Sequence, residues 1–112
     1  MINITLTCEK DGGLHSCVVS GHAGYAEKGD DIVCAAVSIL VRVAVLQLQK
    51  WALDDEELKV SLDYQKTGFV DFCVLQSSED SREALAHLFE FLKLGFESIC
   101  FEYASHVKLE VC

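Results

Sequence analysis

The chain has 112 residues, 51% of them hydrophobic, which is typical of one small globular domain and excludes a disordered chain. Its 18 acidic residues outnumber its 9 basic residues and give a formal net charge of −9, so no nucleic-acid partner is expected. An acidic surface favours basic proteins or peptides as partners, although it also serves plain solubility.

The N-terminal sequence MINITLTCEKDGG has no basic stretch followed by an apolar block, so no signal peptide is expected. The apolar run at residues 32–46 is interrupted by Arg42, and we expect it to be too short to span a bilayer. These features predict a cytoplasmic protein without a membrane partner.

The chain is predicted to open with a β-hairpin. Residues 2–7 alternate apolar and polar side chains, as in a half-buried strand, and residues 14–20 predict a second strand. The turn chemistry of Asp11-Gly12-Gly13 lies between them. Residues 21–30 follow, with Gly21, Gly24 and Gly29 and no hydrophobic periodicity, and they predict a flexible loop.

Residues 32–53 are too long a run for a strand and predict a helix, with Asp31 as its N-cap. The first half of this helix is apolar nearly all round, which indicates burial on more than one side. A sheet covers only one side of a helix. We therefore expect a second subunit to cover another, in a homodimer.

Residues 58–64 and 69–75 predict two further strands, joined by a turn at 65–68. Residues 78–100 have the periodicity of an amphipathic helix, and Asp80 and Glu83 have the spacing of a capping box. A closing strand ends the chain. The predicted fold is a single α+β domain, residues 1–112, with two layers, the order ββαββαβ and two helices on one face of a mostly antiparallel sheet.

Cys34 is the candidate nucleophile. With Asp31 as N-cap it occupies the first helical turn, where unpaired amides and the helix dipole favour a thiolate. His22 precedes the glycine-containing loop and could fold back to take the thiol proton. First-turn amides, that of Cys34 included, could hold the oxyanion of a tetrahedral intermediate.

Plainer interpretations stay open for each candidate. Cys34 could be a buried structural cysteine, and His22 a polar loop residue. Asp31 could only cap the helix or also orient His22. Ser38 lies one turn beyond Cys34 and could line the site or only bond a backbone carbonyl.

The remaining cysteines and histidines are interpreted as structural or surface residues. No two cysteines form a C-x-x-C pair, so neither a zinc site nor a cofactor is expected. The residues concerned are Cys8, Cys17, Cys73, Cys100, Cys112, His15, His87 and His106.

The segment Gly21-His22-Ala23, then Gly29, then Asp31-Ile32-Val33-Cys34-Ala35-Ala36 and Ser38, resembles the ribosomal-processing cysteine protease family, Prp. The family pattern is G-H-A, a short glycine-containing loop and G-x-D-I-V-C-A-A-x-S, and every fixed position is present. The resemblance implies a bacterial cytosolic homodimer with His22 and Cys34 as a catalytic dyad under the loop. The implied reaction removes a short N-terminal extension from a protein of the large ribosomal subunit.

Two rival functions remain. One is a non-catalytic acidic dimeric module that binds a basic ribosomal protein during ribosome assembly. The other is a thiol redox sensor, which needs a resolving cysteine near Cys34.

Overall fold

The computed structural model describes residues 1–27, 31–63 and 68–112, and the order of the elements in this part of the chain confirms the predicted ββαββαβ. The predictions for Gly29 and for the turn at 65–67 lie outside these residues. The elements are β1 (Ile2–Cys8), β2 (Leu14–Gly21), α1 (Ile32–Asp54), β3 (Lys59–Asp63), β4 (Phe69–Gln76), α2 (Arg82–Glu102) and β5 (Val107–Val111).

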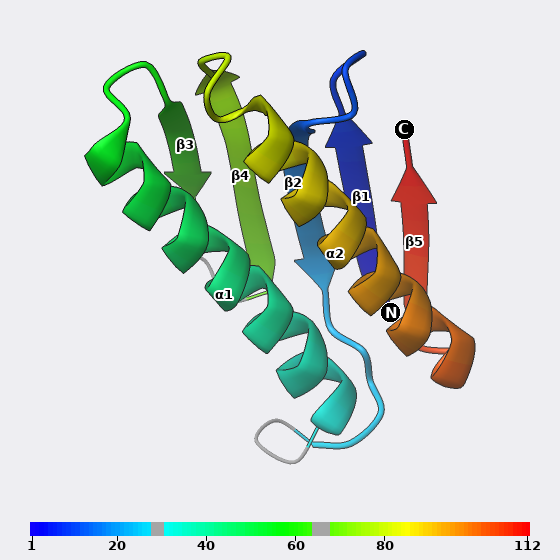
Figure 1. Cartoon of the computed structure of the whole chain (residues 1–112). Helices are drawn as coiled ribbons and strands as arrows, with labels where there is room; N and C mark the ends of the chain where they lie inside the picture. The colour runs from blue at the N-terminus through cyan, green and yellow to red at the C-terminus, as the bar shows by residue number, and fades with distance from the viewer. Residues whose placement is uncertain (28–30, 64–67) are drawn as a thin grey trace.

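The strands form a sheet in the order β3-β4-β2-β1-β5, and both helices cover the same face of it (Figure 1). All neighbouring strands pair antiparallel except β1 and β5, which are parallel. The two helices run in opposite directions, and α1 starts at the end of the sheet where β2 finishes (Figure 1). This arrangement brings the predicted loop residues and the start of α1 together.

Alternation in the strands places one apolar row under the helices. In β1, Ile2, Ile4 and Leu6 are at most 2% exposed, while the residues between them face away from the core. Leu6 pairs with Cys17 of β2, and Cys17 pairs with Phe72 of β4, so the row continues across the sheet. Burial of such side chains contributes about 1.5–3 kcal/mol each to folding.

Helix α1 buries one face and exposes the other. Its buried residues are Val33, Val37, Val41, Ala44, Val45 and Leu48. By length and composition alone, this helix of 23 residues, which extends beyond the run at 32–46, could also cross a membrane. Core helices of soluble proteins pass the same test, and the buried face of α1 packs on the sheet.

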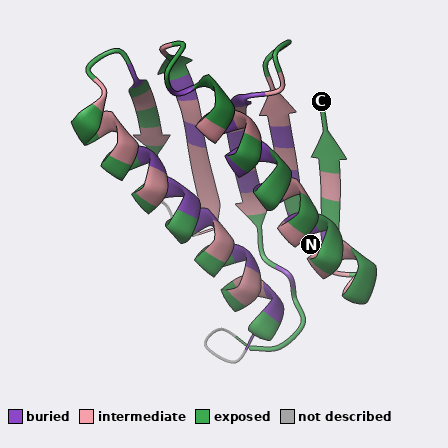
Figure 2. Cartoon of the chain, viewed as in Figure 1, coloured by how far each residue is buried: buried purple, intermediate pink, exposed green. Residues whose placement is uncertain are grey.

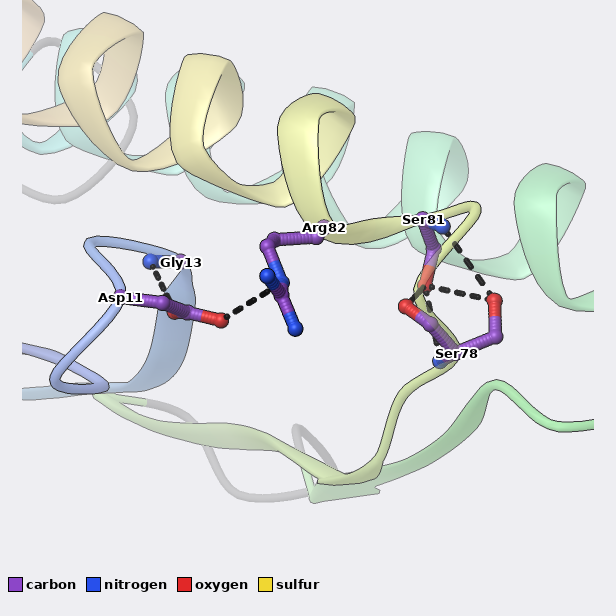
Figure 3. Close-up of polar contacts among 5 residues, drawn as sticks. All are labelled: Asp11, Gly13, Ser78, Ser81 and Arg82. Atoms are coloured by element: carbon purple, nitrogen blue, oxygen red, sulfur yellow. Dashed lines mark hydrogen bonds and ion pairs between the residues drawn. The ribbon is translucent and has the colours of Figure 1, made fainter.

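The start of α2 differs from the prediction. The helix begins at Arg82 with Ser81 as N-cap, so the expected capping box of Asp80 and Glu83 is wrong. Ser78 and Ser81 instead bond each other: the Ser81 N–H donates to Ser78 Oγ (3.2 Å) and the Ser78 N–H to Ser81 Oγ (3.1 Å), as Figure 3 shows. These paired hydroxyls hold residues 78–81 in a turn, so the helix begins only at Arg82.

The turn between β1 and β2 contacts this helix start. Asp11 accepts the Gly13 N–H at 2.9 Å, and its other carboxylate oxygen lies 3.4 Å from Nε of Arg82 (Figure 3). The ion pair is exposed on both sides and links the hairpin to α2.

Candidate active site

A cavity of about 600 Å³ lies where β2 ends and α1 begins. Both candidate catalytic residues line it, His22 from the end of β2 and Cys34 from the first turn of α1. The supporting candidates that the structure describes line it too: Gly21, Gly24, Asp31 and Ser38. The fold therefore gathers these residues in one place, while their catalytic roles stay predictions.

Asp31 caps α1, as predicted. Its Oδ1 atom accepts the N–H groups of Val33 and Cys34, each at 3.0 Å, and its Oδ2 atom accepts the N–H of Tyr25 at 3.1 Å. The pKa of Asp31 lies below its usual value, mainly because of the Cys34 N–H. The carboxylate thus fastens the β2–α1 loop to the helix, and the structure records no bond from it to His22 among the described residues.

The sulfur of Cys34 accepts a backbone hydrogen bond from the β2–α1 loop. The N–H of Ala23, a residue only 3% exposed, donates to Sγ at 3.3 Å. This bond joins the β2–α1 loop to the first turn of α1 at the sulfur. Ala23 is a residue that the sequence reasoning did not single out, although it belongs to the G-H-A motif.

The predicted oxyanion donors are already in use. The N–H groups of Val33 and Cys34 bond Asp31 Oδ1, and the N–H of Ala35 donates to the Asp31 carbonyl at 3.1 Å. In this conformation the Cys34 amide is not available to a developing oxyanion, so that expectation was wrong. The N-cap that starts the helix at this point also takes up the first-turn donors.

His22 lies against Gly68, which precedes β4. A Cβ atom added to Gly68 would lie 2.8 Å from Nε2 of His22, so only glycine leaves room for the ring in this position. The N–H of Gly21 donates to the Gly68 carbonyl at 2.9 Å and holds the two segments together. Gly21 itself has φ +91°, and an added Cβ would collide with the Met1 carbonyl. No sequence pattern linked Gly68 to His22.

Ser38 connects the cavity to a second hollow of about 420 Å³ along α1. The two hollows share four residues, Val19, Val37, Ser38 and Val70. The second hollow extends past Arg42 to Gln49 and is lined mainly by aliphatic side chains. The two hollows thus adjoin along α1, and together they are called the groove here; their apolar lining suits an extended peptide with apolar side chains.

The other thiols differ from Cys34 in their surroundings. All six cysteines lie in the described part of the chain and are free. Burial raises the pKa of Cys17 to about 12, and burial also raises the pKa of Cys100. Among residues 1–27, 31–63 and 68–112, no three His, Cys, Asp or Glu side chains are grouped so that they could hold a metal ion.

Comparison with known proteins agrees with this arrangement. The family described as "Cysteine protease Prp" matches residues 1–108. The ribosomal processing cysteine protease Prp of Bacillus subtilis is 29% identical over 110 residues, which cover 97% of this chain and 96% of that protein. The protein SMU.848 of Streptococcus mutans is 30% identical, with a TM-score of 0.74 and coverage of 99% and 93% of the two chains.

A further solved structure resembles this one in fold. It is the ribosomal processing protease Prp of S. aureus with a covalently linked product peptide, at a TM-score of 0.77, 21% identity and full coverage of both chains. Fold, site and relatives together define a cysteine protease. The chain belongs to the cysteine protease Prp family.

Proposed function

We propose that the chain is a cytoplasmic endopeptidase that uses Cys34 and His22 to remove a short N-terminal extension from a protein of the large ribosomal subunit. One observation carries this proposal. Cys34 and His22 line the same cavity, and the sulfur accepts the N–H of Ala23 at 3.3 Å.

The reaction follows from the two side chains. The His22 imidazole takes the thiol proton, and the Cys34 sulfur attacks the scissile carbonyl carbon to give a tetrahedral intermediate. The intermediate collapses, His22 returns the proton to the leaving amine, and the sulfur keeps the acyl group. Water, deprotonated by His22, then attacks the thioester; the acid is released and the thiol is restored.

The groove supports a peptide as substrate. Aliphatic residues line both hollows, and Arg42 provides a positive charge at the edge of the second one. The relative from S. aureus also holds a peptide, covalently linked. The net charge of −9 suits a basic ribosomal protein, because opposite charges speed the encounter of the two partners.

The decisive test is cleavage of an N-terminally extended ribosomal protein by purified variants. We expect Cys34→Ala and His22→Ala to lose cleavage alike, by a factor on the order of 10³ or more, because the two groups act as a unit. Cys73→Ala is the matched control, since Cys73 pairs with Ser16 and Ser61 within the sheet and does not line the cavity. Cleavage by Cys34→Ala at the wild-type rate would refute the proposal.

Alkylation separates the protease from the binding module. Fast labelling of Cys34 by iodoacetamide, mapped by mass spectrometry, supports a reactive thiol. Labelling no faster than that of Cys73, together with tight binding of the ribosomal protein, would favour the non-catalytic module.

The same proposal includes a homodimer. Ile32, Ile39, Val43 and Leu46 of α1 are 50–56% exposed, and Figure 2 shows exposed residues along the outer sides of both helices. So large an apolar surface on a helix layer is typical of an interface. Light scattering should give twice the chain mass, and Ile39→Glu should lower it to that of one chain; a wild-type monomer would refute the dimer.

A further inference from the structure

Ala23 is held from two sides in the β2–α1 loop. Its N–H donates to the Cys34 sulfur, and its carbonyl oxygen lies 2.9 Å from Nδ1 of His106. Because a carbonyl oxygen only accepts hydrogen bonds, Nδ1 of His106 must carry the proton and donate. The imidazole and the thiol therefore bind the two ends of the same residue.

His106 is itself fixed at the turn between α2 and β5. Its N–H donates to the Tyr103 carbonyl at 2.9 Å, and its own carbonyl accepts the Ile2 N–H at 2.9 Å. Its ring meets the Tyr25 ring edge to face, with centroids 5.3 Å apart. Tyr25 meets Tyr103 in the same way at 5.5 Å. These contacts join the loop to the last turn of the chain.

Gly24, the residue after Ala23, has φ +69°, a conformation that glycine adopts without strain. The hydrogen bonds on both sides of Ala23 therefore fix the position of its N–H beside this turn. An N–H stabilises the charge on a sulfur only while distance and angle are kept. Preorganised donors are worth most because they need no rearrangement during reaction.

We propose that His106 is a positioning residue, which holds Ala23 so that its N–H stays on the Cys34 sulfur. The inference rests on the proposed role of Cys34 as nucleophile. His106 does not line the cavity, so it acts on the reaction through Ala23 and not by touching the substrate. Its contribution is to keep a donor in place for the charged sulfur before attack.

Two substitutions separate the hydrogen bond from the packing of the ring. His106→Phe keeps an aromatic ring against Tyr25 and removes the donor. His106→Asn removes the ring but offers an amide N–H near the position of Nδ1. We expect His106→Phe to lower the alkylation rate of Cys34 at pH 7, and kcat for cleavage, by roughly 3- to 10-fold with little change in KM, the size of one lost hydrogen bond. His106→Asn should recover most of both rates.

Tyr103→Leu is the control for a purely structural effect, because it removes ring contacts and leaves the His106 hydrogen bond to Ala23. Urea unfolding midpoints are measured for all variants. Equal alkylation by His106→Phe and wild type would overturn the proposal. A loss in His106→Phe that Asn does not restore, or that Tyr103→Leu reproduces, would overturn it as well.

The alkylation assay contains no substrate, so it separates this inference from the proposed function. If Cys34→Ala still cleaves the ribosomal protein, the proposed nucleophile is wrong. The alkylation rates of the two His106 variants then still decide whether His106 positions the donor on the sulfur.

Discussion

The two helices begin at opposite ends of the sheet, and their first turns use polar side chains in different ways. At the start of α2, Ser78 and Ser81 bond each other, and the Ser78 hydroxyl also donates to Asp55 at 2.6 Å. At the start of α1, Asp31 binds the helix with one oxygen and the β2–α1 loop with the other.

The difference shows what a helix start needs in order to support chemistry. The two hydroxyls at the start of α2 bond each other, that of Ser78 also bonds Asp55, and neither serine lines the hollow of about 430 Å³ that Arg82 and Leu85 line. The carboxylate of α1 ties two segments together with a thiol between them, and that thiol faces a hollow large enough for a peptide. The start of α1 is a candidate site because the loop before it brings His22 to the cavity and the Ala23 N–H to the sulfur.

Asp31→Ala tests the link between cap and loop and should have the largest effect among the substitutions outside Cys34 and His22. It removes acceptors for three backbone N–H groups, so both the first turn and the loop shift. Displacement of reacting groups by about 1 Å costs on the order of 100-fold in rate, and we expect a loss of that size in kcat for cleavage. Asp55→Ala, which removes the carboxylate bonded to Ser78, should leave kcat unchanged; an equal loss in both would contradict the comparison.

Gly68→Ala and Gly12→Ala form the next pair. Both glycines have positive φ, +80° and +91°, so each alanine should cost about 1 to 2 kcal/mol in unfolding free energy. Only at Gly68 does the added Cβ meet His22, whereas at Gly12 it meets nothing within 4 Å. We expect similar urea midpoints but a loss of cleavage in Gly68→Ala alone. Full activity in that variant would show that the position of the His22 ring does not matter.

Acid unfolding compares the carboxylates near the two helix starts. The pKa of Asp31 lies below 3.8 mainly through the Cys34 N–H, and that of Asp55 lies below 3.8 mainly through the Ser78 hydroxyl. A carboxylate whose pKa is lowered in the folded state stabilises the fold at any pH above its ordinary pKa. This stability is lost as the pH falls through the pKa of the folded state. The excess stability of the wild type over Asp31→Asn, measured by urea unfolding, should therefore be constant above pH 5 and shrink as the pH falls below 3.8.

Arg82→Ala should have the smallest effect. The ion pair with Asp11 is exposed on both sides and longer than a strong hydrogen bond, so its loss should cost about 0.5 kcal/mol or less in unfolding free energy. Cleavage should not change. A drop in cleavage would mean that the start of α2, where Arg82 lies, is coupled to the cavity at the start of α1, and would contradict the comparison.

Much of the fold could be predicted from local pattern. Alternation at Ile2, Ile4 and Leu6 and the length of the run after Asp31 are enough to place β1 and α1. The start of α2 was misplaced because the hydroxyls of Ser78 and Ser81 each accept the other's backbone N–H and form a turn. Hydrophobic periodicity gives no sign of such a turn. The parallel pairing of β1 with β5 joins the two ends of the chain and has no local signal at all.

The part of the site that depends on local sequence spacing could be predicted as well. Asp31, Cys34 and Ser38 lie on one helix, so their spacing places them together. Gly68 and His106 come from other elements: Gly68 lies against the His22 ring, and His106 bonds the Ala23 carbonyl. His106 was taken for a surface residue, yet it is half-buried and bonded to a residue 83 positions away.

The parallel β1–β5 pair also has a consequence for local unfolding. The turn that carries Tyr103 and His106 is held by β5, an edge strand of the sheet, and by its bonds to the N-terminal strand. Fraying of this edge strand should release the contact of His106 with Ala23 before the rest of the sheet opens, so the sheet edge and the loop beside the thiol should loosen together.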